Sequence, residues 1–359
     1  MYNLTQTIEI GYFTDSYEDK MIRPTLKTIA EEMNLSVGAI SRIINGKGKD
    51  IGLNDHTIAS TLVFARKIGY HPHKQAQSLR LGKTNTIGVI LCLPEPNNSD
   101  LIYRLFKGIA QAARKKSQVL MFFDIDDTAS ALAALDQCLT ARVDGIIATN
   151  RNDPVYLERL QELINQGTNI VTVLNRRDDN LLNCPSIIVD HEQGGFIATE
   201  YLIKKGYRKI AHLANSFHGI VGIEHFKGYK RALDTFNIPY NENLVTEDNE
   251  HNQFTGAKSL LCGSELPDAV FCWNDKSAVA AKRIFKEANV KIEVVGFDNR
   301  EFIQYLEEPF SSVDYPLMKV GEKAIETLLS GDLSRRILLI NPEFAEHIQN
   351  NRITNIKPN

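Results

Sequence analysis

Hydroxyl, amide and guanidinium side chains recur along residues 24–46, between apolar residues at helical spacing. The spacing breaks at Asn34, a residue type that tolerates a left-handed backbone, and Ser36 follows in position to cap a second helix. The pattern predicts two short helices joined by a tight turn. A second helix that presents serine and arginine is suited to insertion into the major groove of DNA.

The expected second helix offers three residues to base edges. The fork of Arg42 matches the paired acceptors of guanine, and a phosphate contact is the alternative. Val37 suits contact with a thymine methyl group, whereas Gly38 offers no side chain and weakens the helix by up to about 1 kcal/mol. Four short polar residues suit hydrogen bonds to phosphate oxygens: Thr25, Ser36, Ser41 and Asn45.

Further motifs follow this segment. Residues 53–57 (LNDHT) begin an expected third helix with Asn54 as its cap, and residues 68–70 (IGY) end it. Val63 and Ile68 are expected to close the small core of this head. Residues 77–84 (QSLRLGKT) then precede the apolar run TIGVI. Together with the first segment, this order of motifs resembles the N-terminal region of the lac repressor/galactose repressor family.

The resemblance implies a hinge over residues 71–84 that folds into a short helix on DNA. Leu79 matches the family's leucine that wedges between base steps in the minor groove, which opens a step at a cost of roughly a few kcal/mol. A plain linker residue is the alternative for Leu79. Ala76 and Arg80 are expected to contact the same site.

From Asn85 onward the chain alternates apolar strands with amphipathic helices. Such alternation with short links predicts parallel sheets covered by helices on both faces. The expected strands are 86–93, 119–123, 143–148, 170–174, 209–213, 269–272 and 294–297, and the expected helices are 103–115, 129–141, 157–166, 195–205, 228–236 and 275–288.

The predicted fold class is α/β, with a three-helix head and hinge helix followed by a two-lobed body. Landmarks such as residues 188–190 (IVD), 294–298 (VVGFD) and 309–313 (PFSSV) resemble the periplasmic-binding-protein-like body of the same family. The expected domains are a helix-turn-helix head over 21–70, a hinge over 71–84, an N-lobe over 85–189 and 315–338, and a C-lobe over 190–314 and 339–359. Residues 1–20 are expected to be a disordered tail or to precede the true start at Met21.

A cleft between the lobes implies a small-molecule effector, expected to be a sugar or sugar derivative, because ligands of open α/β sheets bind beyond the strand ends. An amide and a carboxylate can together hold vicinal hydroxyl groups. Trp273 is expected either to stack on a sugar face or to pack in the core. His225 stands where many family members carry an arginine, which disfavours a strongly anionic effector. The expected effector contacts are Asn175, His225, Trp273, Asn274, Asp298 and Tyr315.

The net charge of −3 conceals an uneven distribution. Residues 21–83 hold ten lysines and arginines against four acidic residues, whereas residues 1–20 hold four acidic residues and one lysine. A basic head on an acidic body is typical of a domain that faces phosphates and is joined to a metabolite-binding domain. A merely solvated surface is the alternative.

Other features exclude several classes of protein. No run of 18 apolar residues or secretory signal is present, so a membrane span is not expected and a cytoplasmic location is. Five cysteines without metal spacing are expected to be buried, reduced thiols, and no cofactor or metal is implied. The pair Asp190-His191 has no accompanying nucleophile elbow or P-loop, so it is expected to mark a lobe crossing rather than an enzyme site.

The tail at residues 341–359 has no leucine heptad, which favours a homodimer over a tetramer. Two heads in a dimer imply a roughly palindromic DNA operator. The expected function is therefore an effector-controlled transcriptional regulator, most simply a repressor. The alternative is a solute-binding transport protein.

Overall fold

The structure is a computed structural model that describes residues 24–70, 82–91, 99–149, 153–174, 182–215, 219–248 and 254–347. The chain divides into two units, Met1–Arg80 and Leu81–Asn359, here called the head and the body. The predicted hinge residues Ala76, Leu79 and Arg80 lie outside the described residues, as do residues 1–20.

Among residues 24–70, the described part of the head, three α-helices surround one small core. The elements are α1 (Leu26–Glu32), α2 (Val37–Ile44), the 3-10 helix η1 (Lys49–Ile51) and α3 (Asp55–Lys67). Asn34 adopts a left-handed backbone with φ of 52°, and the Ser36 side chain caps α2 by accepting from the Ala39 amide at 3.1 Å. Both features confirm the turn expected from the sequence.

The third helix of the head is capped as expected, but a different set of its residues packs on the core. The side chain of Asn54 accepts from the Thr57 amide at 2.7 Å. Ile68 packs against the core, but Val63 is 63% exposed, so the expectation that it closes the core is wrong. Thr61 and Ala65 occupy the buried face of α3 instead, because one helix face holds residues four apart.

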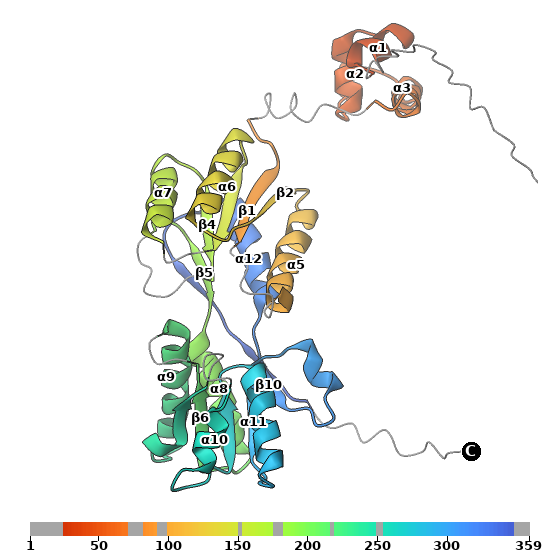
Figure 1. The fold of residues 1–359 in the computed structure, drawn as a ribbon. Coiled ribbons are helices and arrows are strands. Elements are labelled where there is room, and N and C mark those ends of the chain that lie inside the picture. Colours follow the sequence, from red (N-terminus) through yellow and green to blue (C-terminus); the bar gives the residue numbers. More distant parts are fainter. Residues whose placement is uncertain are drawn as a thin grey trace, which may run out of the picture. The chain divides into compact units, whose positions relative to one another are not determined.

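The N-lobe of the body is a six-stranded parallel sheet with helices on both faces (Figure 1). One core lies between the sheet and helices α5 and α12, and the other lies under α6 and α7. The strand order is β11-β5-β4-β3-β1-β2, formed by β1 (Thr86–Leu91), β2 (Val119–Asp124), β3 (Gly145–Thr149), β4 (Ile170–Val173), β5 (Ser186–Val189) and β11 (Ile337–Ile340). The helices are α5 (Ser99–Lys115), α6 (Thr128–Thr140), α7 (Pro154–Asn165) and α12 (Leu317–Ser330).

The C-lobe repeats this plan with one antiparallel edge strand, β12, which pairs with β10. The strand order is β12-β10-β9-β8-β6-β7, formed by β6 (Ile210–Ala214), β7 (Val245–Glu247), β8 (Ala269–Cys272), β9 (Glu293–Asp298), β10 (Ser311–Asp314) and β12 (Glu343–Ala345). The helices are α8 (His191–Lys204), α9 (Ile220–Thr235), α10 (Gly256–Leu261) and α11 (Asp275–Glu287), with 3-10 helices η3 (Glu242–Leu244) and η4 (Glu301–Tyr305).

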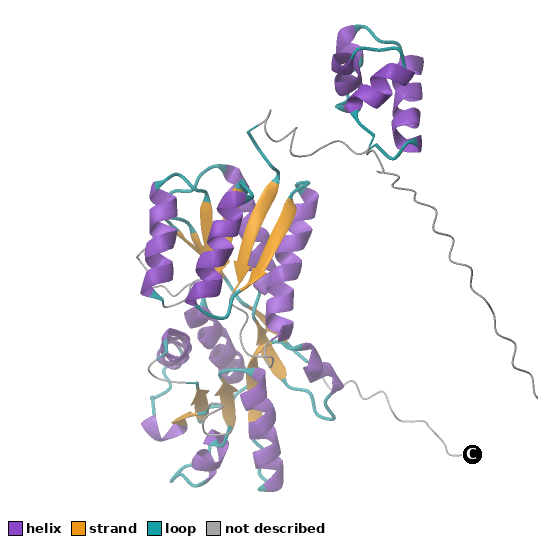
Figure 2. Cartoon of the chain, turned by 45° about the horizontal axis from the view of Figure 1, so that its top comes forward, coloured by secondary structure: helices purple, strands orange, loops and turns teal. Residues whose placement is uncertain are grey.

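The chain passes between the two sheets at three places in the body. These crossings follow β5, β10 and β11, and Figure 2 shows the two sheets with the helices that cover them. Because β11 pairs with β5 through Ile340, the third crossing falls at residues 341–342 rather than at the expected boundary between 338 and 339. All three connections are short, so side chains from the strand ends of both lobes meet near the crossings.

Helices α8 and α9 pack against each other more closely than ordinary side chains permit. A Cβ atom at Gly195 would collide with the His225 carbonyl group, and one at Gly228 would collide with that of Glu192. The sequence predicted that these helices begin at Gly195 and Gly228, whereas they begin at His191 and Ile220. The glycines lie inside the helices because they are needed for this close approach.

Two expectations about composition can be compared with the described residues. Cys138, Cys184 and Cys272 are buried, but Cys262 is exposed, so the expectation of uniformly buried thiols is wrong. Within the described ranges, the helices are too short or too polar to cross a membrane.

Candidate functional site: an inter-lobe cleft and a DNA-facing helix

The body contains a cavity of about 240 Å³ where the two lobes meet. Five of the six residues expected from the sequence to contact an effector line it: His225, Trp273, Asn274, Asp298 and Tyr315. The sixth, Asn175, lies outside the described residues. The cavity also has lining residues that the sequence did not suggest, namely Leu101, His191, Asn215, Val221, Phe297 and Arg300.

Asp298 ends strand β9 and presents a buried carboxylate to the cavity. Its φ of 107° is rare for a residue with a side chain, a kind of strain that clusters at functional sites. Burial raises the pKa of Asp298 to about 7, and the nearby Arg300 and Arg104 guanidinium groups oppose that rise. The carboxylate is thus poised between its charged and neutral forms near neutral pH.

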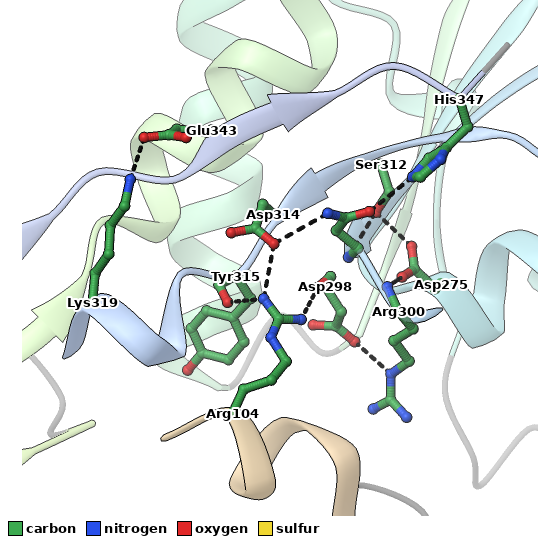
Figure 3. Close-up of polar contacts among 11 residues, drawn as sticks. Arg104, Asp275, Asp298, Arg300, Ser312, Asp314, Tyr315, Lys319, Glu343 and His347 are labelled. Carbon is green, nitrogen blue, oxygen red and sulfur yellow. Dashed lines mark hydrogen bonds and ion pairs between the residues drawn. The ribbon is translucent and has the colours of Figure 1, made fainter. Parts of the chain in front are cut away.

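Two arginines hold the segment around Asp298 against the N-lobe (Figure 3). Arg104 of α5 donates to the Asp298 carbonyl oxygen at 2.7 Å, to Asp314 Oδ1 at 2.8 Å, and to the Tyr315 carbonyl oxygen. Arg300 donates through Nε to Asp298 Oδ2 at 3.2 Å and through Nη1 to Asp100 Oδ1 of α5 at 3.0 Å. One turn of α5 therefore contacts both the effector-facing strand end and a crossing.

A second layer of polar contacts fixes the backbone beneath Asp298. The buried Asp275 carboxylate accepts from the Arg300 amide at 2.7 Å and from the Ser312 hydroxyl at 2.6 Å. His347 Nε2 lies 2.8 Å from the side-chain oxygen of Asn299 (Figure 3). Burial and then the Asp298 charge raise the pKa of Asp275. These contacts orient the strand end, although Asp275, Ser312 and His347 do not line the cavity.

Two histidines line the cavity side by side. His191 Nδ1 and His225 Nε2 lie 3.2 Å apart, and the His225 ring packs tilted against Phe297 with centroids 4.4 Å apart. Burial, then His191 and His212, lower the pKa of His225, so its ring is neutral. Its Nδ1 atom is buried and has no hydrogen-bond partner among the described residues.

Asn274 and Trp273 each have a structural contact as well as a place in the lining. The Asn274 side-chain oxygen caps α11 by accepting from the Ser277 amide at 2.8 Å. The Trp273 indole N–H donates to the Asp248 carbonyl oxygen. The half-buried Trp273 ring is therefore held in place at the cavity wall, so the two expectations for it are compatible.

Two of the lining residues that were not expected to contact an effector, His191 and Arg300, nevertheless have a weak signal in the sequence. His191 follows directly on the β5 crossing, and Arg300 lies two residues beyond Asp298, so both stand at strand ends that face the cleft. Arg300 supplies the cleft with a guanidinium group, which the histidine at position 225 does not. Its charge is neutralised by Asp298 and Asp100, which a linear sequence could not indicate.

In the head, helix α2 presents its predicted DNA-contact residues away from the core. Ile40 and Ile43 are buried on its inner side, while Val37 is 46% exposed and Gly38 and Arg42 are exposed. Arg42 makes no ion pair with any described residue, so its guanidinium group is available to an external partner.

The four residues of the head that are predicted to contact phosphates also make hydrogen bonds within the head. The hydroxyl oxygens of Thr25 and Ser36 accept backbone N–H groups as helix caps, and the Thr25 hydroxyl also lies 3.1 Å from that of Thr28. Asn45 donates through Nδ2 to the Ser41 carbonyl oxygen at 2.6 Å. The caps thus place both hydroxyls at helix N-termini, which favour phosphate.

Comparison with known proteins supports both parts of this description. Residues 199–335 match the model of a periplasmic-binding-protein-like domain. Over 334 residues the chain is 27% identical to the HTH-type transcriptional repressor PurR of Vibrio atlanticus, covering 90% of this chain and 97% of that protein. It is 28% identical to the ribose operon repressor of Haemophilus influenzae over 314 residues, covering 85% and 91%.

The fold is also that of a solved repressor. The lac repressor dimer bound to operator and the anti-inducer ONPF superposes with a TM-score of 0.71 at 19% identity, covering 90% of this chain and 98% of that one. The alternative of a solute-binding transport protein finds no support among these relatives.

A head with an outward-facing helix, joined to a two-lobed ligand-binding body, defines an effector-controlled transcriptional regulator. The chain is similar to members of the lac repressor/galactose repressor family.

Proposed function

We propose that this protein is a transcriptional repressor whose affinity for a DNA operator changes when a sugar or sugar derivative binds between the lobes of its body. The observation that carries the proposal is the cavity lined together by His225, from within α9, and by Trp273, Asn274, Asp298 and Tyr315, from strand ends. A small ligand there contacts both lobes and so biases their arrangement.

The chemistry of the cavity favours an uncharged effector with several hydroxyl groups. Asp298 supplies acceptor oxygens, and Asn274 and Arg300 supply donors. The rings of Phe297, Tyr315 and Trp273 offer apolar faces. Because the guanidinium group of Arg300 already faces two carboxylates, a strongly anionic effector would have to displace one of them.

On the DNA side, we propose that Arg42 reads a guanine or clamps a phosphate and that Val37 and Gly38 face base edges. Thr25, Ser36, Ser41 and Asn45 would contact phosphates, and the hinge residues Ala76, Leu79 and Arg80 would contact the minor groove. Such a protein acts in the cytoplasm, where its DNA is.

We propose further that the protein acts as a homodimer on a roughly palindromic operator. Strand β2 is an edge of the N-lobe sheet, and it leaves Val119 44% and Phe122 40% exposed. Tyr103 of α5 is 60% exposed, and Phe106 of α5 packs edge-on against Phe122 with centroids 5.3 Å apart. An apolar face of this kind is typical of a subunit interface.

A gel shift with the promoter beside the protein's own gene tests this proposal. Sugars and sugar derivatives are first screened by thermal shift, where a ligand at 100 times its Kd stabilises the protein by about 2.7 kcal/mol. A stabilising ligand is expected to change the amount of shifted DNA in wild type and to have a weaker effect on Asp298→Asn. A ligand that stabilises the protein but leaves the gel shift unchanged would contradict the proposed control.

A further inference from the structure

A second cavity of about 240 Å³ adjoins the first in the inter-lobe cleft. The two cavities share the lining residues His191, Asn215, Val221 and Tyr315, so they form neighbouring compartments of one site. We call them the Asp298 compartment and the Glu224 compartment, after the acidic residue that lines each. None of the residues expected from the sequence belongs to the Glu224 compartment alone.

The Glu224 compartment contains a buried carboxylate. Glu224 is only 5% exposed, lies on α9, and is the only acidic residue among the described residues that line this cavity. The next residue on α9, His225, lines the Asp298 compartment. A single helix therefore contributes to both compartments, and a buried carboxylate facing a cavity is a strong acceptor for hydroxyl or N–H donors.

The same compartment offers hydrogen-bond donors from the start of α9. Gly219 occupies the N-cap position, and no side chain of a described residue caps the first turn. Gly219, Ile220, Val221 and Gly222 all line the cavity. The first amides of a helix have no partner within the helix, so acceptor atoms of a ligand can meet them.

The remaining lining of the Glu224 compartment is aliphatic, from Leu174, Ile188 and Val189. Each compartment thus combines one carboxylate, several N–H donors and an apolar wall. That combination recognises a hydroxylated ring with apolar faces. The repetition of these features side by side indicates a ligand built from two such units.

We infer that the effector is an uncharged molecule of two hydroxylated rings, such as a disaccharide or glycoside, and that Glu224 binds hydroxyl groups of the second ring. The inference rests on the proposed function and adds to it the size of the ligand and a binding residue. Two acidic residues in the lining disfavour a ligand with an anionic second unit.

Isothermal titration calorimetry on the full chain tests this inference with matched sugars: D-glucose with cellobiose and maltose, and D-galactose with lactose and melibiose. At least one disaccharide is expected to bind about tenfold or more tightly than its monosaccharide. Glu224→Gln is expected to weaken that disaccharide about tenfold, the loss of one charge-assisted hydrogen bond, and to change monosaccharide binding less than about twofold. Asp298→Asn should weaken both.

Two further variants separate binding from folding. Glu287→Gln changes an exposed glutamate of α11 in the same lobe and is expected to leave every Kd unchanged. Ile220→Phe narrows only the Glu224 compartment, so it is expected to weaken the disaccharide alone. Equal affinity for single and double rings, binding of no disaccharide, or Glu224→Gln and Ile220→Phe variants with wild-type Kd would each overturn the inference. If monosaccharides still bind and require Asp298, the proposed function stands without it.

Discussion

Replacing Arg104 with methionine tests the contact between α5 and the effector-facing strand end. The substitution removes donors to the Asp298 and Tyr315 carbonyl oxygens and to the Asp314 carboxylate. The Arg104 and Asp314 side chains are 21% and 30% exposed, so the ion pair is partly screened by solvent. Hydrogen bonds to charged groups contribute about 1.5–3 kcal/mol each when buried. With partial exposure and residual solvation of the carbonyls, we expect a total loss of about 2 kcal/mol.

For a domain of this size, that loss corresponds to a fall in Tm of about 4–8 °C in calorimetry. Arg159→Met is the matched control because Arg159 pairs with Asp136 and Glu162, which are 69% and 52% exposed, within the N-lobe. The control is expected to cost less than about 1 kcal/mol. If Arg104→Met lowers Tm no more than Arg159→Met, Arg104 does not hold the lobes as inferred.

Four other substitutions give distinct outcomes. Because burial raises the pKa of Asp298 from 3.8 to about 7, the folded protein retains a proton that the unfolded chain releases, and stability falls as pH rises across that interval. The Tm of Asp298→Asn relative to wild type should therefore increase between about pH 5 and about pH 8, and a constant or falling difference would refute this pKa. Arg42→Gln should reduce the salt dependence of DNA binding by about one phosphate contact or relax specificity at one guanine, as measured by anisotropy; unchanged binding would remove Arg42 from the interface. Gly228→Ala should destabilise the body by about 1–3 kcal/mol in urea unfolding, because its Cβ would meet the α8 backbone, whereas Gly38→Ala, with its nearest neighbour at 3.9 Å, should stabilise α2; equal effects would contradict the packing of α8 on α9.

Helices and strands could be predicted from the sequence wherever one local pattern of residues determines the structure. Strand Ala269–Cys272 was predicted with its observed bounds because a short apolar run between turn residues suits a buried parallel strand. The starts of α8 and α9 were predicted too late because Gly195 and Gly228 resemble helix boundaries in sequence. Only the neighbouring helix shows why those glycines lie inside.

Only part of the cleft could be predicted from the sequence, namely the residues whose position follows from a neighbouring strand. Asn274 and Asp298 follow strands, so their position at the strand ends could be inferred. Glu224 lies within a helix next to His225, and nothing in its local sequence shows that the side chain is buried. Arg104 comes from the opposite lobe, almost 200 residues from Asp298, so its role required the three-dimensional arrangement.

We propose above all that the head binds DNA through basic and polar groups on α2 and its surroundings. Fluorescence anisotropy of the full chain on the promoter beside its own gene, titrated from about 50 to about 200 mM salt, tests this most directly. We expect specific binding that weakens by about a thousandfold or more over this range, as for a protein with several phosphate contacts. Binding that is absent, or that does not change with salt, would contradict it.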